Sequence, residues 1–473
     1  MAAAVAAILG APRFARAHGA APRPDDIEAL ALAIRAASRE GALDVAAQAM
    51  RAGAGHGGVL AAAFLAGVAD IRPRPHGILH SVMMVESAYE LAAAAGSERE
   101  AALVALWNVD DFKRSQERDR EEDGDYVMKP LDAGGARKAS ADEARREFLA
   151  AMDAWDAPRA ERAVAALHPH ATVDSFFEIF WPIAARCYAF IGHKMIYAVQ
   201  TERALRRIGW EHAEPALRSL VLSLLVERNT AANDRVRSLA PKLPAGWLGG
   251  KEDADRVEPL ARAFREASPA AASEVAIAAF AEGTGPATVF DALTLVGSEV
   301  FARRPGKRSA DGRDSLLPVH ALTVTSAFRH AFLAARDDAT KRLMALQAAS
   351  WLASLRDDLG RMVGLSMAGL DPAAAGEPPK DLDAVFESGS PASARALLER
   401  SPDATAEYLA RIRSALFRRG REHHQHKYAA AMEEESARVA PRFRARIVAP
   451  AIDYLAHPAD TETDVYRRSL KLL

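Results

Sequence analysis

Apolar residues recur at intervals of three and four positions along most of this chain, which is the spacing of one face of an α-helix. Ala, Leu, Arg and Glu fill most positions, and no long segment alternates polar and apolar side chains as a half-buried strand does. The pattern therefore predicts an all-α protein. The predicted helices cover residues 26–50, 58–71, 80–96, 97–107, 141–152, 172–208 (with a bend near Pro182), 211–227, 254–266, 269–282, 317–336, 339–359, 390–400, 404–419, 422–439 and 441–457.

Four stretches interrupt the helical pattern. Residues 112–138 are charged and contain glycine, and they predict a surface loop or lid. Segments rich in proline, glycine or charge also occur at 241–253, 303–314 and 371–381, where we expect loops. None of the four resembles a linker between domains.

One large helical domain is therefore expected over residues 23–473, with helices of irregular length and inward-facing histidines. The first residues, 1–22, are apolar at the start but lack the basic region of a signal peptide. We expect them to form a tail or a weakly docked segment.

Composition excludes several classes of protein. The net charge of about -2 gives no basic surface for nucleic acid, and no run of about 20 apolar residues predicts a membrane span. The single cysteine, Cys187, rules out an internal disulfide and any site built on paired cysteines. The chain is thus expected in a reducing, cytoplasmic compartment, and nothing in it indicates an oligomeric state.

The densest chemistry lies at residues 421–428 (REHHQHKY), which hold three of the 14 histidines. On a helix, His423, His426 and Lys427 share a face, and His424 is turned away by roughly 100°. Two imidazoles and an amine are costly to bury unless they bind a metal or a substrate. The alternative is a polar face in water.

Three other segments each place a histidine on an apolar helix. His80 begins a predicted helix, His193 lies in an aromatic and apolar helix, and His320 begins a long apolar helix. Helical proteins build metal sites from inward side chains on several helices, and imidazole suits Zn, Cu, Fe and Ni. A shared metal site and scattered, unrelated histidines both remain open on this pattern.

The order of these segments resembles the questin oxidase-like family, helical oxygenases that act on anthraquinone-type aromatic polyketides. The similar motifs stand at 79–83 (LHSVM), 193–196 (HKMI), 320–323 (HALT), 424–428 (HQHKY) and 441–444 (PRFR). Together they span most of the chain.

The resemblance implies a non-haem iron held by four histidines and a lysine carboxylated by CO₂. Carried over, it places His80, His193, His320, His423 and Lys427 on the metal. The iron would be Fe(II), with zinc as the alternative ion.

The family expects a second histidine four residues after His193, where this chain has Tyr197. We take Tyr197 and His426 as the catalytic candidates beside the metal. Alternatively, Tyr197 would be a hydrogen-bond donor to a metal ligand. Gln425 stands where the family has an aspartate.

The function expected from this resemblance is a metal-dependent oxidoreductase, a mono- or dioxygenase that uses O₂ on a flat, hydrophobic or aromatic small molecule. No glycine-rich nucleotide motif is evident, although NADPH could act as reductant without one. Two alternatives stay open: a helical scaffold or binding protein without metal, and a zinc-dependent hydrolase. The four aromatic residues of 176–181 could wall a substrate pocket or simply pack in the core.

Overall fold

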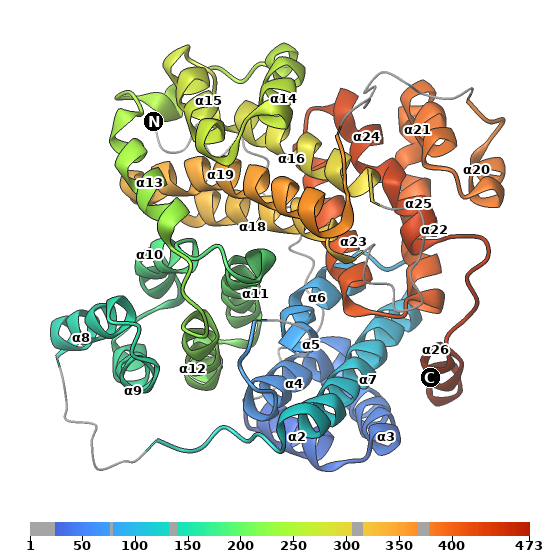
Figure 1. The fold of residues 1–473 in the computed structure, drawn as a ribbon. Helices are drawn as coiled ribbons and strands as arrows, with labels where there is room; N and C mark the ends of the chain where they lie inside the picture. Colours follow the sequence, from blue (N-terminus) through green and yellow to red (C-terminus); the bar gives the residue numbers. More distant parts are fainter. Residues whose placement is uncertain (1–23, 76–78, 132–139, 305–315, 368–377) are drawn as a thin grey trace.

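The computed structural model describes residues 24–75, 79–131, 140–304, 316–367 and 378–473 (Figure 1). Over these residues the chain forms helices and no strand, with a single isolated bridge between Lys251 and Thr284. The predicted all-α fold is therefore confirmed. The expected N-terminal segment 1–22 lies outside the described residues.

The helices of the first half lie mostly in the lower part of Figure 1, although α13 lies at the upper left. They are α2 (Pro24–Ala36), α3 (Arg39–Ala49), α4 (Gly55–Asp70), α5 (His80–Met83), α6 (Val85–Ala93), α7 (Glu98–Asp123), α8 (Ala141–Asp153), α9 (Ala157–Leu167), α10 (Val173–Ala184), α11 (His193–Ile208), α12 (Ala213–Leu224) and α13 (Ala231–Leu239).

The helices of the second half form the upper part of Figure 1, where α18 and α19 lie side by side. They are α14 (Val257–Glu266), α15 (Pro269–Ala281), α16 (Pro286–Ala302), α18 (Val319–Ala334), α19 (Asp338–Val363), α20 (Leu382–Ser388), α21 (Pro391–Arg400), α22 (Thr405–Arg419), α23 (His423–Arg438), α24 (Arg444–Val448), α25 (Ile452–Leu455) and α26 (Asp464–Leu472).

The expected loop at 112–138 is wrong for its first part, because α7 continues as helix to Asp123 and the loop begins only at Gly124. The helix lacks an apolar period there since its buried face is polar and includes Lys113, Gln116 and Asp119. Lys113 donates to the backbone oxygen of Arg35 at 3.1 Å, and Gln116 donates to Asp70 at 2.8 Å. Residues 132–139 of the expected loop lie outside the described part of the chain.

Other boundaries also differ from the prediction. The stretch 26–50 is two helices, because Ser38 caps α3 by accepting from the backbone N–H of Gly41 at 3.0 Å. The stretch 172–208 is divided into α10 and α11 by an irregular segment, although Pro182 itself lies inside α10.

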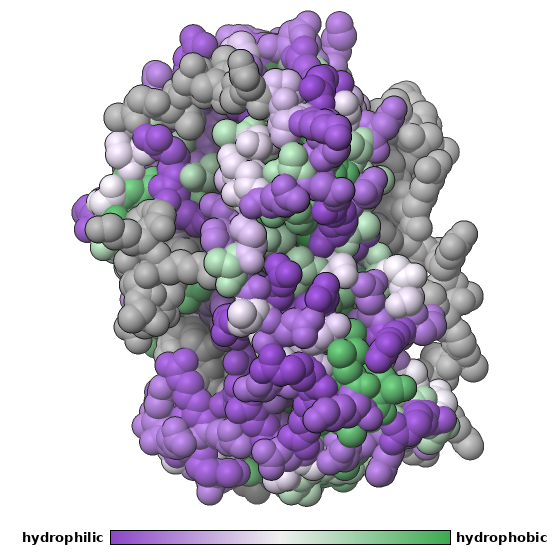
Figure 2. Space-filling view, turned by 90° about the vertical axis from the view of Figure 1, so that its right-hand side faces the viewer, coloured by the Kyte–Doolittle hydropathy of each residue, from purple (hydrophilic) through white to green (hydrophobic). Residues whose placement is uncertain are grey.

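One stretch, Arg39–Asp70, is long and apolar enough by composition to cross a membrane. It is broken at Gly53, where φ is 106°, and most of its apolar window is buried inside the protein. Helix α4 is accordingly a core helix. The face in Figure 2 is mainly hydrophilic, with a small hydrophobic area.

Four helices decide the position of the candidate site. Helix α6 packs on α11 and α23, and α18 packs on the same two helices. The four thus form a closed ring of neighbours. Helices α11, α18 and α23 begin at the same end of this ring, where the short helix α5 leads into α6. Residues at equal distances from that end therefore lie at similar depths along the ring.

Candidate metal centre

Four separated stretches of the chain begin helices at one buried point. His80 begins α5, which leads into α6, and His193 begins α11. His320 is the second residue of α18, and His423 begins α23. The imidazoles therefore meet at the ends of the helices, not along their faces.

His193 lies at the centre of the closest contacts. Its Nε2 atom is 2.8 Å from Nε2 of His80 and 2.7 Å from Nε2 of His320. Two nitrogen ligands at right angles on a metal, each about 2.1 Å away, stand about 3.0 Å apart. The three nitrogens are thus spaced like neighbouring ligands of one ion.

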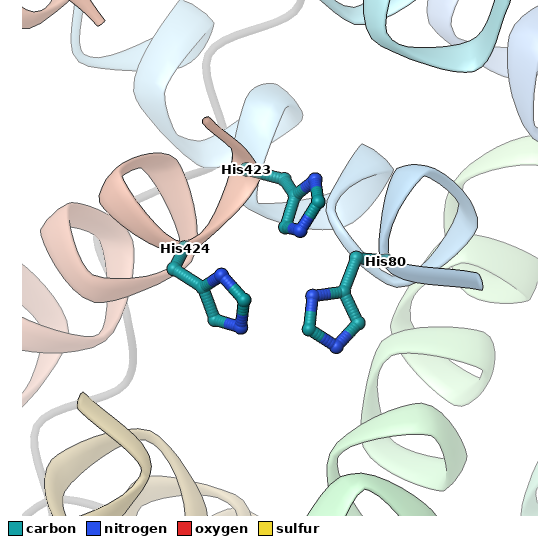
Figure 3. A group of neighbouring side chains, drawn as sticks. All are labelled: His80, His423 and His424. Atoms are coloured by element: carbon teal, nitrogen blue, oxygen red, sulfur yellow. The ribbon is translucent and has the colours of Figure 1, made fainter. Parts of the chain in front are cut away.

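Two more imidazoles come from the start of α23. The rings of His423 and His424 lie with their centroids 4.4 Å and 4.2 Å from that of His80, as Figure 3 shows. Ligand nitrogens fall into two groups, His80 with His423 and His424, and His193 with His320 and His424, each lying within 4.8 Å of one another. His424 belongs to both groups, so five imidazoles make one cluster.

Hydrogen bonds at Nδ1 direct the other ring nitrogen of two histidines toward the cluster. Nδ1 of His320 lies 3.1 Å from the backbone oxygen of Leu317, which can only accept. Nδ1 of His424 lies 2.7 Å from Oε2 of Glu422. Each ring therefore carries its proton on Nδ1 and leaves the Nε2 lone pair free, which is the form that binds a metal.

His423 has a carboxylate behind it. Its Nδ1 lies 3.4 Å from Oδ2 of Asp111, a residue of α7 that is 2% exposed. Burial opposes ionisation of Asp111, but His423 and Arg114 outweigh it and lower the pKa of the carboxyl. A carboxylate behind a ligating histidine is a common outer partner in metal sites because it orients the ring and raises its basicity.

The start of α23 is held by its capping residue. The Glu422 side chain accepts from the backbone N–H of His424 at 3.0 Å and from the Tyr454 hydroxyl at 2.7 Å. Gln425 returns a contact to the backbone N–H of Arg421 at 2.8 Å. This capping box fixes the backbone that carries His423 and His424.

The start of α11 is held differently, by a strained turn. Phe190, Ile191 and Gly192 all have positive φ, at 59°, 45° and 87°. A Cβ atom on Gly192 would lie 2.4 Å from Val324 and 2.6 Å from Trp351, so only glycine fits. Non-glycine residues in this conformation are costly and often occur at functional sites. Here the strained turn presents His193.

Burial favours the neutral form of four imidazoles of the cluster. It lowers the pKa of His80, His193 and His424 well below the usual value, with a further contribution from Lys427 at each of the three. For the same reasons the pKa of His320 falls to about 3. Neutral imidazole is the ligating form, so the cluster is prepared for a cation at neutral pH.

Lys427 follows His423 by one helical turn and is 2% exposed. Burial lowers the pKa of its amine to about 7, although Glu422 and Asp111 act in the opposite direction. Among the described residues its Nζ atom has no hydrogen-bond partner. Such an unpaired buried amine is rare, because buried polar groups nearly always have a hydrogen-bond partner.

The structure brings together four of the expected metal ligands, His80, His193, His320 and His423, with Lys427 beside them. Tyr197 is placed differently. Its hydroxyl donates to Oγ of Ser219 at 2.8 Å, on helix α12, which contributes nothing to the cluster.

His426 also faces away from the cluster. Its ring packs on Trp107 of α7, with centroids 4.0 Å apart. Neither ring nitrogen has a hydrogen-bond partner in the described part of the chain. The contact helps to join α23 to α7.

Three residues of the site escaped the sequence analysis: His424, Asp111 and Glu422. The helical period predicted that His424 points away from His423 and Lys427. That prediction applies to contacts along the side of a helix. At the start of a helix, side chains that point in different directions can still reach the same site. The sequence signal available was an acidic residue directly before the histidines, which is typical of a capping residue.

The aromatic residues of 176–181 pack with one another in the core. Ring centroids of Phe176 and Phe180 are 5.2 Å apart, and those of Phe177 and Trp181 are 5.0 Å apart. All four side chains are at most 1% exposed. This segment is therefore core packing.

No family model matches the chain, and neither a curated protein nor a solved structure matches it.

Proposed function

We propose that this protein is a metal-dependent oxidoreductase whose metal is held by the histidine cluster. The observation that carries the proposal is the convergence of five imidazoles from four helix starts, with the Nε2 atoms of His80, His193 and His320 at 2.7 and 2.8 Å spacings. The two carboxylates behind His423 and His424 support it, because such partners belong to ligating histidines.

The ion proposed is Fe(II), by the resemblance to questin oxidase-like proteins, and zinc is the alternative. A bound non-haem iron would supply the binding and activation of O₂. The chain's own residues would hold the ion, keep its ligands neutral and exclude bulk water. NADPH is one reductant that such a reaction could use.

Lys427 is proposed to become a carbamate. Its neutral amine would form a C–N bond with CO₂ and release one proton, which gives an anionic oxygen ligand to a site made otherwise of imidazoles. Its burial, its unpaired Nζ atom and the lowered pKa of the amine support this step.

A flat hydrophobic substrate is proposed for the pocket on the outer side of the strained turn. Its volume is about 220 Å³, and its lining includes Tyr188, Ile191 and Trp351 together with the charged residues Asp357, Asp358 and Arg361. Trp351 also touches the position of Gly192, directly before His193.

Elemental analysis of the purified protein tests the proposal. We expect close to one equivalent of iron in the protein as isolated or after anaerobic reconstitution, and loss of this iron in His193→Ala. His170→Ala is the matched control, because His170 is exposed and outside the cluster. If the protein binds zinc under all conditions, the result would favour the zinc-dependent hydrolase. If it binds no metal under any condition, the helical scaffold without metal would be the remaining interpretation.

Two further measurements separate the parts of the proposal. Loading with ¹³C-labelled CO₂ should give a carbamate signal that is lost in Lys427→Met. Binding of an anthraquinone-type compound, measured by quenching of tryptophan fluorescence, should weaken in Trp351→Ala while the iron content stays unchanged.

A further inference from the structure

A narrow cleft runs inside the ring of α6, α11, α18 and α23, directly beyond the histidine cluster. Its residues recur at the same distances from the four helix starts. Ile196, Thr323 and Lys427 come one turn after the histidines, and Ser87 and Gln200 come about two turns after them. The cleft therefore continues inward from the cluster along the helix axes.

The outer end of the cleft is charged and reaches solvent. Glu90, Arg203 and Glu434 line it about three turns from the cluster, which is about 15 Å at 1.5 Å per residue. The side chains of Glu90 and Glu434 are 26% and 21% exposed. The cleft thus connects the protein surface with the buried centre.

Three polar atoms along this cleft lack a partner. They are Oγ of Ser87, Oε1 of Gln200 and Nζ of Lys427, each buried and without a hydrogen bond to any described residue. Buried polar groups are nearly always satisfied by protein or by ordered water. The space is only wide enough for water-sized molecules, so water is the occupant that fits.

One carboxyl group stands inside the cleft. Glu86 is 2% exposed, and it accepts from Nε of Arg207 at 2.8 Å. The charged groups around it are Arg207 and Arg203 on α11, Glu90 on its own helix, and Lys427 and Glu434 on α23, while α18 presents only the uncharged Thr323 and Ser326.

We infer that this cleft is a water-filled proton route between bulk solvent and the histidine cluster, with Glu86 as the relay carboxyl. A proton reaches the mouth as hydronium at Glu90 and Glu434, binds the Glu86 carboxylate and passes to a water in the cleft. That water gives one of its other protons onward, past Ser87 and Gln200 toward Lys427. One proton moves inward for each one taken up, and no electron moves.

Two properties support the relay. Burial raises the pKa of Glu86 to about 7, even though Arg207 opposes the rise, so this carboxyl can both hold and release a proton near neutral pH. The reduction of O₂ consumes protons, and the cluster is buried, so the proposed oxidoreductase would require a proton route from solvent. The purpose of the route therefore rests on the proposed function.

A high-resolution crystal structure of the metal-free protein tests the water. We expect ordered waters within hydrogen-bond distance of Ser87 Oγ, Gln200 Oε1 and Lys427 Nζ, in a continuous row to the surface. A dry cleft would overturn the inference. This experiment needs no metal, so its outcome is independent of the metal content that tests the proposed function.

Infrared spectroscopy of the metal-free protein tests the relay. The stretching band of protonated buried carboxyl groups should titrate around pH 7, and Glu86→Gln should remove part of it. Glu433→Gln should remove a second, separate component, because burial raises the pKa of Glu433 to about 7 as well, yet this side chain pairs with Arg413 outside the cleft. The component of Glu86 is therefore the one that Glu86→Gln removes and Glu433→Gln keeps.

Solvent exchange and a variant that narrows the cleft distinguish a proton relay from an acid that is merely buried. On transfer from H₂O to D₂O, the infrared component of Glu86 should shift at once to the frequency of the deuterated carboxyl. Ala430 lines the same cleft, so a crystal structure of Ala430→Leu should show fewer ordered waters there. A Glu86 carboxyl that stays ionised across the neutral range would overturn the relay.

Discussion

Oδ2 of Asp111 lies 3.4 Å from Nδ1 of His423, so a carboxylate on α7 stands behind an imidazole on α23. The contact joins helices far apart in the chain at the one ligand that is partly exposed, with 18% of its side chain accessible. We expect Asp111→Asn to weaken metal binding about 10- to 100-fold, because the ring loses the partner that orients it. Competition with a chelator of known affinity measures the change.

A matched control for that variant is Asp110→Asn. Asp110 is the neighbouring buried acid on α7, but its carboxylate accepts from Arg39 at 2.7 Å. Its removal should leave metal affinity unchanged. Equal losses in the two variants would mean that general damage to α7, not the contact with His423, is responsible.

His424 should matter for metal binding as much as the histidines that the sequence pattern indicated. It belongs to both groups of close ligand nitrogens. We expect His424→Ala to lose more affinity than the about 100-fold that loss of an outer partner can cost. Full metal content in His424→Ala, measured after dialysis, would remove this residue from the ligand set.

Acid should destabilise the metal-free protein steeply. Burial lowers the pKa of His320 to about 3 and that of His426 to about 4, and it also lowers the pKa of His80, His193 and His424 well below the usual value. Between about pH 6.5 and pH 4 the unfolded chain binds protons at these sites and the folded chain does not. Each histidine then removes about 1.4 kcal/mol of the free energy of unfolding per pH unit.

Two carboxyl groups act against this trend. Burial raises the pKa values of Glu86 and Glu433 to about 7. Their contribution to the free energy of unfolding therefore falls as the pH increases from the pKa of the unfolded chain to about 7. Urea unfolding at several pH values measures the sum. The slope should decrease in His320→Leu, and an unchanged slope in that variant would contradict the neutral, buried imidazole.

Lys427 should affect the stability of the metal-free protein in the alkaline pH range. Its folded pKa of about 7 lies below its usual value of 10.5, so the unfolded chain binds an extra proton between these two values. The free energy of unfolding of the metal-free protein should therefore rise as the pH increases from about 7 to about 10. Lys427→Met should abolish this rise, whereas Lys242→Met, at an exposed lysine, should keep it.

His426 offers a test of a residue expected to be catalytic. Because its ring is fully buried on Trp107 and neither nitrogen has a partner among the described residues, His426→Leu should stabilise the metal-free protein by about 1–2 kcal/mol. Thermal and urea unfolding measure the gain. A loss of turnover with unchanged metal content would instead assign His426 to the reaction.

The sequence predicted the fold class well, because helical periodicity and the lack of strand patterns are local properties. It placed the loop start near Phe112 wrongly, since α7 buries polar residues such as Gln116 that carry no apolar period. It also could not reveal that Asp111 faces His423, because this contact depends on the packing of α7 against α23, which no local pattern encodes.

The candidate site shows the same division. His80, His193 and His320 were selected by their apolar surroundings, which reflect burial, and burial is readable in a sequence. The direction of Tyr197 toward Ser219 was not readable, because a residue four positions after His193 lies on the same side of the helix only approximately. The role of His424 required knowledge that the other helices begin beside the start of α23.

The meeting of helix starts has one more consequence. Helices α11, α18 and α23 each direct the positive end of their dipole toward the imidazoles. A metal cation held by neutral imidazoles and a single carbamate would keep part of its positive charge there, so small exogenous anions such as azide or cyanide would be drawn to it. Spectral titration of the metal-loaded protein with such anions would then show tight binding that weakens only slightly with salt, as expected for a charge shielded from solvent.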